Sequence, residues 1–328
     1  MNTERLKKMP KIKIIFMGTP DFAVPVLKVL HEKYDVVLAV TRADKPKGRG
    51  KKMSVTPVKE TAEALGIPVV TPESVKTPEF TELLRSYNAD IFVTCAYGKI
   101  LPQSVIDVPP MGIVNVHASL LPKYRGAAPI WRVILNGETE TGVTTMLTDI
   151  GMDTGKILLS EKIEIGHEMT TGELHDKLSE IGASLIVKTI DGLADGSITP
   201  VAQDDSLACY SPMVSRADGA IDWNCGAETV HNKVRGCNPF PGAFAELNGE
   251  KIKIIKTVTG KICDENCVPG TVTNSAPDGI DVCCGDGKIL TIKEIQGNSS
   301  RAMSVRDYLN GHKIQKGEIF GNGDKGEN

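Results

Sequence analysis

Residues 12–17 read IKIIFM, and Gly18-Thr19-Pro20 ends this apolar run with a turn. Apolar residues then recur at helical spacing over residues 22–34, and a second apolar run, DVVLAV, follows at 35–40. Residues 42–56 are predicted to be a loop. The same alternation then predicts strands at 68–70, 90–95, 112–116, 142–148 and 157–163, and helices at 57–65, 78–87, 128–136 and 171–194. Continuous apolar strands that alternate with helices are typical of a parallel sheet covered on both faces. We therefore predict an α/β fold that begins with a Rossmann-like, mostly parallel sheet.

The pattern changes after residue 196. Residues 197–212 begin and end with turn-forming Ser and Pro and are predicted to be a linker. One helix is predicted at 226–236, and short strands separated by Gly and Asn turns are predicted near 243–248, 251–258, 268–273, 279–284 and 288–294. Such a succession is typical of a small β-barrel. The predicted organisation is a catalytic domain over 10–196, an OB-like C-terminal domain over 213–320 and a disordered tail over 321–328.

Length and composition restrict the class of protein. A chain of 328 residues corresponds to about two domains. Hydrophobic residues make up 41% and charged residues 24%, which fits a globular protein and excludes a disordered, collagen-like or coiled-coil chain. The net charge of -3 gives no overall basic field for nucleic acid. Residues 1–10 are polar and no run is long enough to span a bilayer, so we expect no signal peptide and a cytoplasmic location.

Seven of the eight cysteines follow residue 200. A disulfide framework is not expected in a chain of this length without a secretion signal. Cys263 and Cys267, followed by Cys283 and Cys284, could be four zinc ligands. Their spacing differs from that of paired zinc-ribbon knuckles, and the adjacent Cys283 and Cys284 would point to opposite faces of a strand. We therefore predict reduced thiols and no metal site.

Polar residues at the ends of predicted strands indicate where chemistry occurs. Gly18-Thr19-Pro20 stands where a Rossmann protein places its phosphate-binding turn, but the later glycines of that motif are missing, so a dinucleotide site is weakly supported. Asn115 and His117 end the strand GIVNV and share one face of it. Asp153 follows the next strand on a Gly-rich loop, from which it can reach the histidine. An amide, an imidazole and a carboxylate without a nucleophilic Ser or Cys fit acyl transfer by direct attack of an amine.

Several longer stretches carry a family resemblance. NVHASLLPKYRG at residues 115–126, with DIGMDTG at 149–155, resembles the 10-formyltetrahydrofolate-dependent formyltransferase superfamily. Within it, MGTPDFAVPVL at 17–27, CAYGKILP at 95–102 and NPFPGA at 238–243 resemble the branch that acts on methionyl-tRNA. The resemblance runs from residue 12 to about residue 320.

The resemblance implies a function. It implies transfer of the formyl group of 10-formyltetrahydrofolate to the α-amine of methionine on initiator tRNA, with Asn115, His117 and Asp153 as the catalytic trio. The residues that would line the folate site are Ser119, Leu120, Leu121 and Pro122. The second domain would contact tRNA. No metal, membrane or obligate protein partner is implied.

One segment is strongly basic. Between residues 41 and 58, six cationic side chains face one acid, Asp44. The six are Arg42, Lys45, Lys47, Arg49, Lys51 and Lys52. The segment, which we call the basic segment, lies at the same sheet edge as the predicted trio and is predicted to bind the phosphates of tRNA. In the resembling family the arginine matched by Arg49 is the main contact with the acceptor arm.

The second domain departs from the expected charge of a tRNA-binding barrel. From residue 213 onward, 14 Lys and Arg face 15 Asp and Glu, so that the domain is close to neutral. A tRNA contact there requires segregated charge. The candidate cations are Lys233, Arg235, Lys251, Lys253 and Lys256.

Three alternatives stay open from the residues. A sister formyltransferase that acts on a nucleotide-linked amino sugar would share the trio but would not need the basic segment. A hydrolase that releases formate from 10-formyltetrahydrofolate would leave the basic segment and NPFPGA unexplained. A catalytically inactive RNA-binding module would have no use for the intact Asn115, His117 and Asp153.

Overall fold

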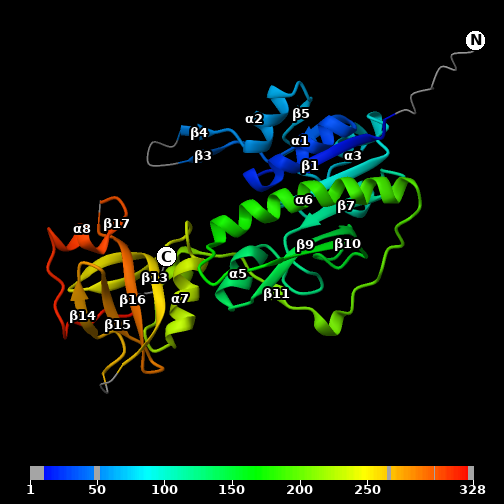
Figure 1. The fold of residues 1–328 in the computed structure, drawn as a ribbon. Helices are drawn as coiled ribbons and strands as arrows, with labels where there is room; N and C mark the ends of the chain where they lie inside the picture. The colour runs from blue at the N-terminus through cyan, green and yellow to red at the C-terminus, as the bar shows by residue number, and fades with distance from the viewer. Residues whose placement is uncertain (1–10, 48–51, 264–266, 299, 324–328) are drawn as a thin grey trace, which may run out of the picture. The chain divides into compact units, whose positions relative to one another are not determined.

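A computed structural model describes residues 11–47, 52–263, 267–298 and 300–323 of the chain (Figure 1). The chain divides into two compact units. The first comprises Met1–Ala127, Gly142–Lys162 and Asp176–Tyr210, and the second comprises Ala128–Thr141, Ile163–His175 and Ser211–Asn328. Two short segments that precede residue 176 therefore belong to the second unit.

The first unit contains a seven-stranded sheet with the order β10-β9-β7-β6-β1-β2-β5 in the described residues. Its strands are β1 (Lys13–Gly18), β2 (Asp35–Val40), β5 (Val69–Val70), β6 (Ile91–Cys95), β7 (Ile113–His117), β9 (Glu140–Leu147) and β10 (Ile157–Glu164). The strands from β7 to β5 pair in parallel, whereas β9 runs antiparallel to β7. The predicted α/β fold with a mostly parallel sheet is confirmed. The reversal at β9 was not predicted, because an apolar run does not reveal the direction of its strand.

Helices cover both faces of this sheet. They are α1 (Val24–Lys33), α2 (Pro57–Ala64), α3 (Pro78–Ser86), α4 (Gln103–Ile106) and α6 (Thr171–Ala194), with short 3₁₀ turns at η1 (Asp21–Ala23) and η2 (Asp205–Leu207). Side chains alternate along β1, so that Ile15 and Met17 share one face, where they join a buried cluster with Phe80 of α3. On the other face α6 crosses β7 closely (Figure 1): a Cβ added at Gly182 would lie 3.0 Å from a methyl group of Val116.

The segment predicted as a loop at 42–56 contains two short strands instead. β3 (Lys45–Lys47) and β4 (Lys52–Ser54) pair antiparallel, with Lys45 opposite Ser54. Figure 1 shows them side by side, extending from the first unit. The prediction of a loop was wrong because this ladder is held by backbone hydrogen bonds and has no apolar alternation. α2 begins directly after it, where Thr56 Oγ1 accepts a hydrogen bond from Lys59 N at 3.2 Å.

The second unit is built on an antiparallel sheet with the order β12-β13-β16-β15-β14, and β17 pairs with β16. Its strands are β12 (Ala243–Leu247), β13 (Glu250–Ile262), β14 (Val272–Ala276), β15 (Gly279–Cys283), β16 (Lys288–Gln296) and β17 (Met303–Ser304). Its helices are α5 (Pro129–Leu135), α7 (Ala227–Gly236), α8 (Val305–Leu309) and the 3₁₀ turn η3 (Arg216–Gly219). Trp223, Val230 of α7 and Ile254 of β13 lie in one buried core, with α7 against β13 (Figure 1). The predicted β-rich domain is confirmed.

A small second sheet and a disulfide complete the description of the fold. β8 (Arg125–Gly126) and β11 (Tyr210–Ser211) pair in a separate two-stranded sheet. Cys267 and Cys283 are joined by a disulfide, so the expectation of reduced thiols throughout is not met in this structure. Sequence spacing could not show that the chain after β13 returns to the end of β15.

Candidate active site

Asn115 and His117 lie at the carboxyl end of β7, an inner strand between β6 and β9. Asn115 is half-buried and His117 is 6% exposed. On the neighbouring β6, Thr94 Oγ1 donates a hydrogen bond to Asn115 Oδ1 at 2.8 Å. This bond orients the amide, so that Asn115 Nδ2 faces Asp153.

Asp153 reaches the same place from the loop between β9 and β10. Its Oδ2 accepts a hydrogen bond from Gly126 N at 2.8 Å and lies 3.7 Å from His117 Nδ1. Its Oδ1 lies 3.4 Å from Asn115 Nδ2. The structure therefore brings Asn115, His117 and Asp153 together, although they come from two different segments of the chain.

The second ring nitrogen of His117 determines where its hydrogen atoms lie. Nε2 is 3.0 Å from the carbonyl oxygen of Tyr124. A carbonyl only accepts hydrogen bonds, so Nε2 carries a hydrogen atom. Nδ1, which faces Asp153, is then the nitrogen that can gain or lose a proton.

The loop that carries Asp153 is braced from within. Asp149 Oδ1 accepts hydrogen bonds from Thr154 Oγ1 at 2.6 Å and from Gly151 N at 3.0 Å. A Cβ at Gly155 would lie 1.6 Å from the carbonyl oxygen of Leu147, so only glycine fits there. Asp153 itself has a φ of 54°, in the left-handed region that costs free energy unless its surroundings hold it.

Two residues that the sequence did not single out hold this strained position. Gln203 Nε2 donates to the carbonyl oxygens of Asp153 at 2.9 Å and Gly155 at 2.7 Å. The side-chain oxygen of Gln203 accepts hydrogen bonds from Arg125 Nε at 3.1 Å and Nη2 at 2.8 Å. Arg125 is 2% exposed and also pairs with Asp205 at 2.7 Å. No local pattern could have identified Gln203, which lies in the predicted linker; Arg125 stands in the quoted NVHASLLPKYRG stretch.

Arg125 stays charged despite its burial. Burial lowers the pKa of its guanidinium, but the hydrogen bond and the charge of Asp205 leave the pKa above its ordinary value. A buried cation that is fully paired can serve as a fixed anchor. Arg125 and Gln203 thus connect the Asp153 loop to the segment near β11.

The predicted folate-lining segment follows His117 directly. Ser119 and Leu121 are buried, whereas Leu120 and Pro122 are half-buried. Ser119 Oγ donates to Lys123 O at 2.7 Å, and Thr144 Oγ1 donates to Ser119 O at 2.7 Å. The side chain of Ser119 is therefore engaged within the segment and shapes it, while Leu120 and Pro122 are the members with exposed surface.

The basic segment is only partly described. Arg49 and Lys51 lie outside the described residues, and for Lys45, Lys47 and Lys52 the structure describes the strands and not the side chains. Asp44 pairs with Lys59 at 2.8 Å. Because Lys59 neutralises the only acid of the segment, the segment's own cations are not compensated from within.

Arg42 lies apart from the β3–β4 hairpin. A Cβ at Gly98 would stand 3.2 Å from its Nη1, which places the guanidinium beside the turn that follows β6. In that turn, Tyr97 O accepts a hydrogen bond from Thr19 Oγ1 at 3.1 Å. Burial raises the pKa of Tyr97 to about 12, with the positive charge of Arg42 opposing the shift, and the buried hydroxyl has no hydrogen-bond partner among the described residues. The carboxyl edge of the sheet therefore offers a cation and an unsatisfied hydroxyl next to the first turn.

Comparison with known proteins decides the family. The formyl transferase family model matches residues 11–190, and the model of the formyl transferase C-terminal domain matches residues 213–313. The chain is 50% identical over 311 residues to the methionyl-tRNA formyltransferase of Acetivibrio thermocellus, covering 94% of this chain and 100% of that protein. It is also 50% identical over 313 residues to that of Ruminiclostridium cellulolyticum, with the same coverage.

The chain belongs to the methionyl-tRNA formyltransferase family.

Solved structures agree with this family's fold. The chain resembles the N-formyltransferase of Helicobacter canadensis, whose structure holds folinic acid and dTDP-3-aminofucose, with a TM-score of 0.64 and 20% identity, covering 87% of this chain and 99% of that one. It also resembles HypX of Aquifex aeolicus in complex with tetrahydrofolic acid, with a TM-score of 0.59 and 16% identity, covering 91% of this chain and 47% of that one. At these identities the likeness concerns the fold alone.

The candidate tRNA-binding cations of the second unit differ in how far they are exposed and in what they already bind. Arg235 is 6% exposed and donates to Met169 O at 3.0 Å and Asn232 Oδ1 at 2.8 Å, so the interpretation of Arg235 as a tRNA contact is wrong: it is a buried structural residue. Sequence could not show this, because the carbonyl that it meets lies far away in the chain.

The four candidate lysines of the second unit are placed differently. Lys233 Nζ donates to Asp218 O at 2.9 Å. Lys253 and Lys256 are exposed, and Lys251 Nζ lies 3.3 Å from the centre of the Phe244 ring.

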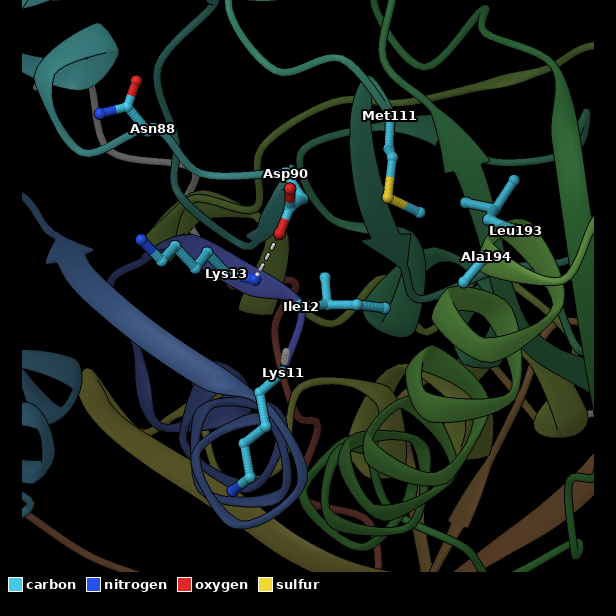
Figure 2. Close-up of a pocket in the computed structure, with 8 residues that line it drawn as sticks. All are labelled: Lys11, Ile12, Lys13, Asn88, Asp90, Met111, Leu193 and Ala194. Carbon is cyan, nitrogen blue, oxygen red and sulfur yellow. Dashed lines mark hydrogen bonds between the residues drawn. The ribbon is translucent and has the colours of Figure 1, made fainter. Parts of the chain in front are cut away.

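A hollow at the opposite edge of the sheet has a different character. Figure 2 shows it at the amino ends of β1 and β6, lined by Ile12, Met111 and Leu193, with Lys13 N donating to Asp90 Oδ2 at 2.7 Å. Open α/β sheets bind ligands at the carboxyl ends of their strands. We therefore assign no part of the family's chemistry to this hollow. Among the described residues, no helix combines the length and apolarity that crossing a bilayer requires.

Proposed function

We propose that the chain transfers the formyl group of 10-formyltetrahydrofolate to the α-amine of methionine on initiator tRNA. The observation that carries the proposal is the convergence of Asn115, His117 and Asp153 in a member of this family. The set combines an N–H donor, a titratable ring and a carboxylate, which are the groups that direct attack of an amine on a formyl carbon requires.

Asn115 is proposed to stabilise the negative charge that develops on the formyl oxygen. Its amide nitrogen has two N–H groups, of which one faces Asp153 at 3.4 Å. The other can point at the oxygen. Thr94 holds the amide in this orientation, so that no reorganisation is needed as the charge appears.

His117 and Asp153 are proposed to move the proton. The attacking amine loses a proton, and the N10 atom of the leaving folate needs one. His117 Nδ1 is the nitrogen able to take and return it, because Nε2 is held by Tyr124 O. Asp153 stabilises the protonated ring and sets its orientation, for which the 3.7 Å separation must close to hydrogen-bond distance during turnover.

The folate co-substrate is proposed to lie along residues 119–122. Leu120 and Pro122 expose apolar surface there, and the segment leads directly from His117. Such a strip beside the trio suits a flat pterin ring, whose polar edge can bond to backbone groups.

The basic segment is proposed to bind the acceptor arm of tRNA. Lys45, Lys47 and Lys52 lie on the two strands of a hairpin that extends from the catalytic unit, and Asp44 is already neutralised by Lys59. Phosphate contacts of this kind supply affinity and depend strongly on salt. In the second unit, Lys253 and Lys256 are proposed as weaker contacts.

Arg49→Ala should raise the KM for charged tRNA far more than the KM for folate. The planar guanidinium can bind a phosphate bidentately, whereas lysine is a point charge, so Arg49→Lys should restore only part of the loss. Trypsin should cut after Arg49, Lys51 or Lys52, and initiator tRNA should protect these bonds at low salt only. Equal cutting with and without tRNA, together with normal tRNA use by Arg49→Ala, would show that the segment is an ordinary surface.

We also propose that the protein works in the cytoplasm, where tRNA is aminoacylated. Its two substrates are charged tRNA and a soluble folate, and neither requires a membrane or an obligate protein partner.

The decisive experiment is formylation by the purified chain of charged initiator tRNA with 10-formyltetrahydrofolate. Charged elongator tRNA and a nucleotide-linked amino sugar serve as competing acceptors, and Asn115→Ala as the inactive control. The proposal expects formyl-methionyl initiator tRNA as the main product. Preference for the sugar would identify the sister activity, and formate release without any acceptor would identify a hydrolase.

A further inference from the structure

Three cysteine sulfurs meet in the second unit. Cys263 follows β13 directly, Cys267 lies in the connection to β14, and Cys283 ends β15. Their Sγ atoms all lie within 4.8 Å of one another. Cys267 and Cys283 are joined as a disulfide, and Cys263 Sγ is 3.1 Å from Cys267 Sγ. We call these residues the three-thiol cluster.

Backbone hydrogen bonds hold two members of the cluster, Cys263 and Cys283, independently of the disulfide. Cys263 N donates a hydrogen bond to Gly287 O at 3.0 Å, in the turn between β15 and β16. Cys283 N donates to Thr271 O at 2.9 Å, and Gly270 N donates to Cys283 O at 2.8 Å. The β13–β14 connection is therefore tied at both ends to the β15–β16 hairpin. The thiols converge because the barrel brings these two connections together.

Cys284 does not belong to the cluster. It is buried within the apolar core of the barrel, together with Val282 and Leu290. The alternation of side chains along a strand directs neighbours to opposite faces, so Cys283 reaches the cluster and Cys284 does not. The donor set is thus three sulfurs from three separate points of the fold.

A set of three thiols suits a thiophilic cation better than it suits a disulfide. A disulfide uses two of the three sulfurs, whereas a metal ion can be bound by all three. Thiolates bind zinc in tetrahedral sites with Zn–S distances of about 2.3 Å. Cys263 and Cys267 are half-buried, so solvent can supply a fourth ligand, while Cys283 anchors the site from the buried side.

We propose that the three-thiol cluster, when reduced, binds one Zn²⁺ ion through Cys263, Cys267 and Cys283. Metal binding in place of a lasting disulfide rests on the cytoplasmic location proposed above, because cytosolic thiols are kept reduced. All three ligands lie outside the catalytic trio. The ion would pin the β13–β14 connection to the β15–β16 hairpin and stabilise the barrel.

The disulfide and the metal site are related by a balanced redox step. An external dithiol supplies two electrons and two protons and is itself oxidised to a disulfide. The Cys267–Cys283 bond breaks and gives two thiols. These two and Cys263 then release three protons as their thiolates bind the ion.

The experiment is a Co²⁺ titration of the full-length chain, reduced and kept without oxygen. Co²⁺ replaces Zn²⁺ in thiolate sites and reports sulfur ligation by its ligand-to-metal charge-transfer absorption. We expect saturation at one ion per chain and displacement by Zn²⁺. Cys263→Ser should weaken binding by about 100-fold or more, since loss of a supporting group outside the ligands alone costs about 10–100-fold. Cys225→Ser, in the same unit but outside the cluster, should bind like the unaltered chain.

A second measurement needs no variant. Zn²⁺ should protect Cys263, Cys267 and Cys283 of the reduced chain from alkylation, as read by peptide mass spectrometry, while the exposed Cys209 is alkylated equally with and without the ion. Absence of the absorption, or equal Co²⁺ binding by Cys263→Ser, would overturn the proposal. Cys263→Ser retains Cys267 and Cys283, so it still forms the disulfide and separates the two chemistries. Neither readout measures formylation, so a failure here leaves the proposed function standing.

Discussion

His117 in the first unit and His167 in the second both stand beside carboxylates, yet their ring nitrogens are used differently. His117 has one nitrogen held by a carbonyl and the other 3.7 Å from Asp153. His167 has both nitrogens held by carboxylates, at 3.0 Å from Glu168 and 2.8 Å from Glu228. The hydrogen bond that His167 donates to Glu168 and the charge of Glu228 raise the pKa of His167, with burial opposing.

The neighbour of His167 extends the comparison. His231 stacks on His167 with ring centres 4.7 Å apart, donates through Nε2 to His167 O at 3.1 Å and accepts through Nδ1 from Thr257 Oγ1 at 3.0 Å. Burial is the largest cause that lowers the pKa of this ring. A histidine beside a carboxylate is therefore not in itself a sign of catalysis. What distinguishes His117 is a nitrogen whose partner can be exchanged during a reaction.

The largest effect is expected from removing that nitrogen. His117→Asn should lower kcat by about 10²–10⁴-fold, while folate binding stays nearly normal, because the ring acts on charge that appears only in the transition state. Asn115→Ala should cost about 100-fold or more. The matched control is His167→Asn, which should leave kcat nearly unchanged. Comparable losses from His117→Asn and His167→Asn would remove the distinction between the two histidines.

Asp153→Asn should have the next largest effect on turnover. The amide cannot stabilise a protonated ring, so we expect a loss of about 10²-fold in kcat and a shifted pH dependence of kcat. Asp107→Asn, at the exposed residue that directly follows α4, is the control. A normal rate with an unchanged pH profile would reduce Asp153 to a residue that only shapes its loop.

Gln203→Ala should have a smaller effect of about 10-fold in kcat, because Gln203 acts through the position of Asp153. As a positioning residue it should shift the pH profile in the same direction as Asp153→Asn. In the Asp153→Asn background it should have little further effect, since the two act as one unit. Gln103→Ala on α4 is the control. Fully multiplicative losses in the double variant would contradict the coupling.

The smallest effect concerns the stability of the second unit. Because the folded pKa of His231 lies below the unfolded value of 6.5, the unfolded state binds more protons, and the free energy of unfolding should fall as the pH drops below 6.5. His167 contributes in the opposite sense, but it is half-exposed and screened. His231→Gln should flatten the pH dependence of the free energy of unfolding, by no more than about 1.4 kcal/mol per pH unit.

The unfolding of the second unit can be followed by fluorescence. Both tryptophans, Trp131 and Trp223, lie in this unit, so their fluorescence during thermal unfolding reports its stability. A slope unchanged by His231→Gln would mean that other groups titrate.

The elements that were predicted well are those whose information is local. The predicted helix at 171–194 matches α6 at both ends, and the run DVVLAV matches β2, because apolar periodicity and flanking turns are properties of neighbouring residues. The β3–β4 hairpin was missed for the complementary reason. Its strands read KPK and KMS, where charge hides any alternation.

In the candidate site, too, the residues with a local sequence signal were predicted, and those that act through distant contacts were not. Asn115 and His117 were found together because period two and the end of a strand are visible in five residues, and Asp153 because a Gly-rich turn follows the next strand. Gln203 and Thr94 were missed. Gln203 acts through a contact to a carbonyl 50 residues away, and Thr94 looks like an ordinary member of an apolar strand.

The sequence by itself determined the order and type of most elements, the candidate trio and the charge of the basic segment, because each depends on residue type and short spacing. Only the tertiary structure decided that Arg235 is buried, that Gln203 and Arg125 hold the strained Asp153, and that three of the four clustered cysteines meet while Cys284 turns into the core. These outcomes depend on which backbone groups become neighbours when sheets close. A carbonyl, an amide or a thiol gains its role from the partner that folding places within about 3 Å of it, and that partner has no fixed distance along the chain.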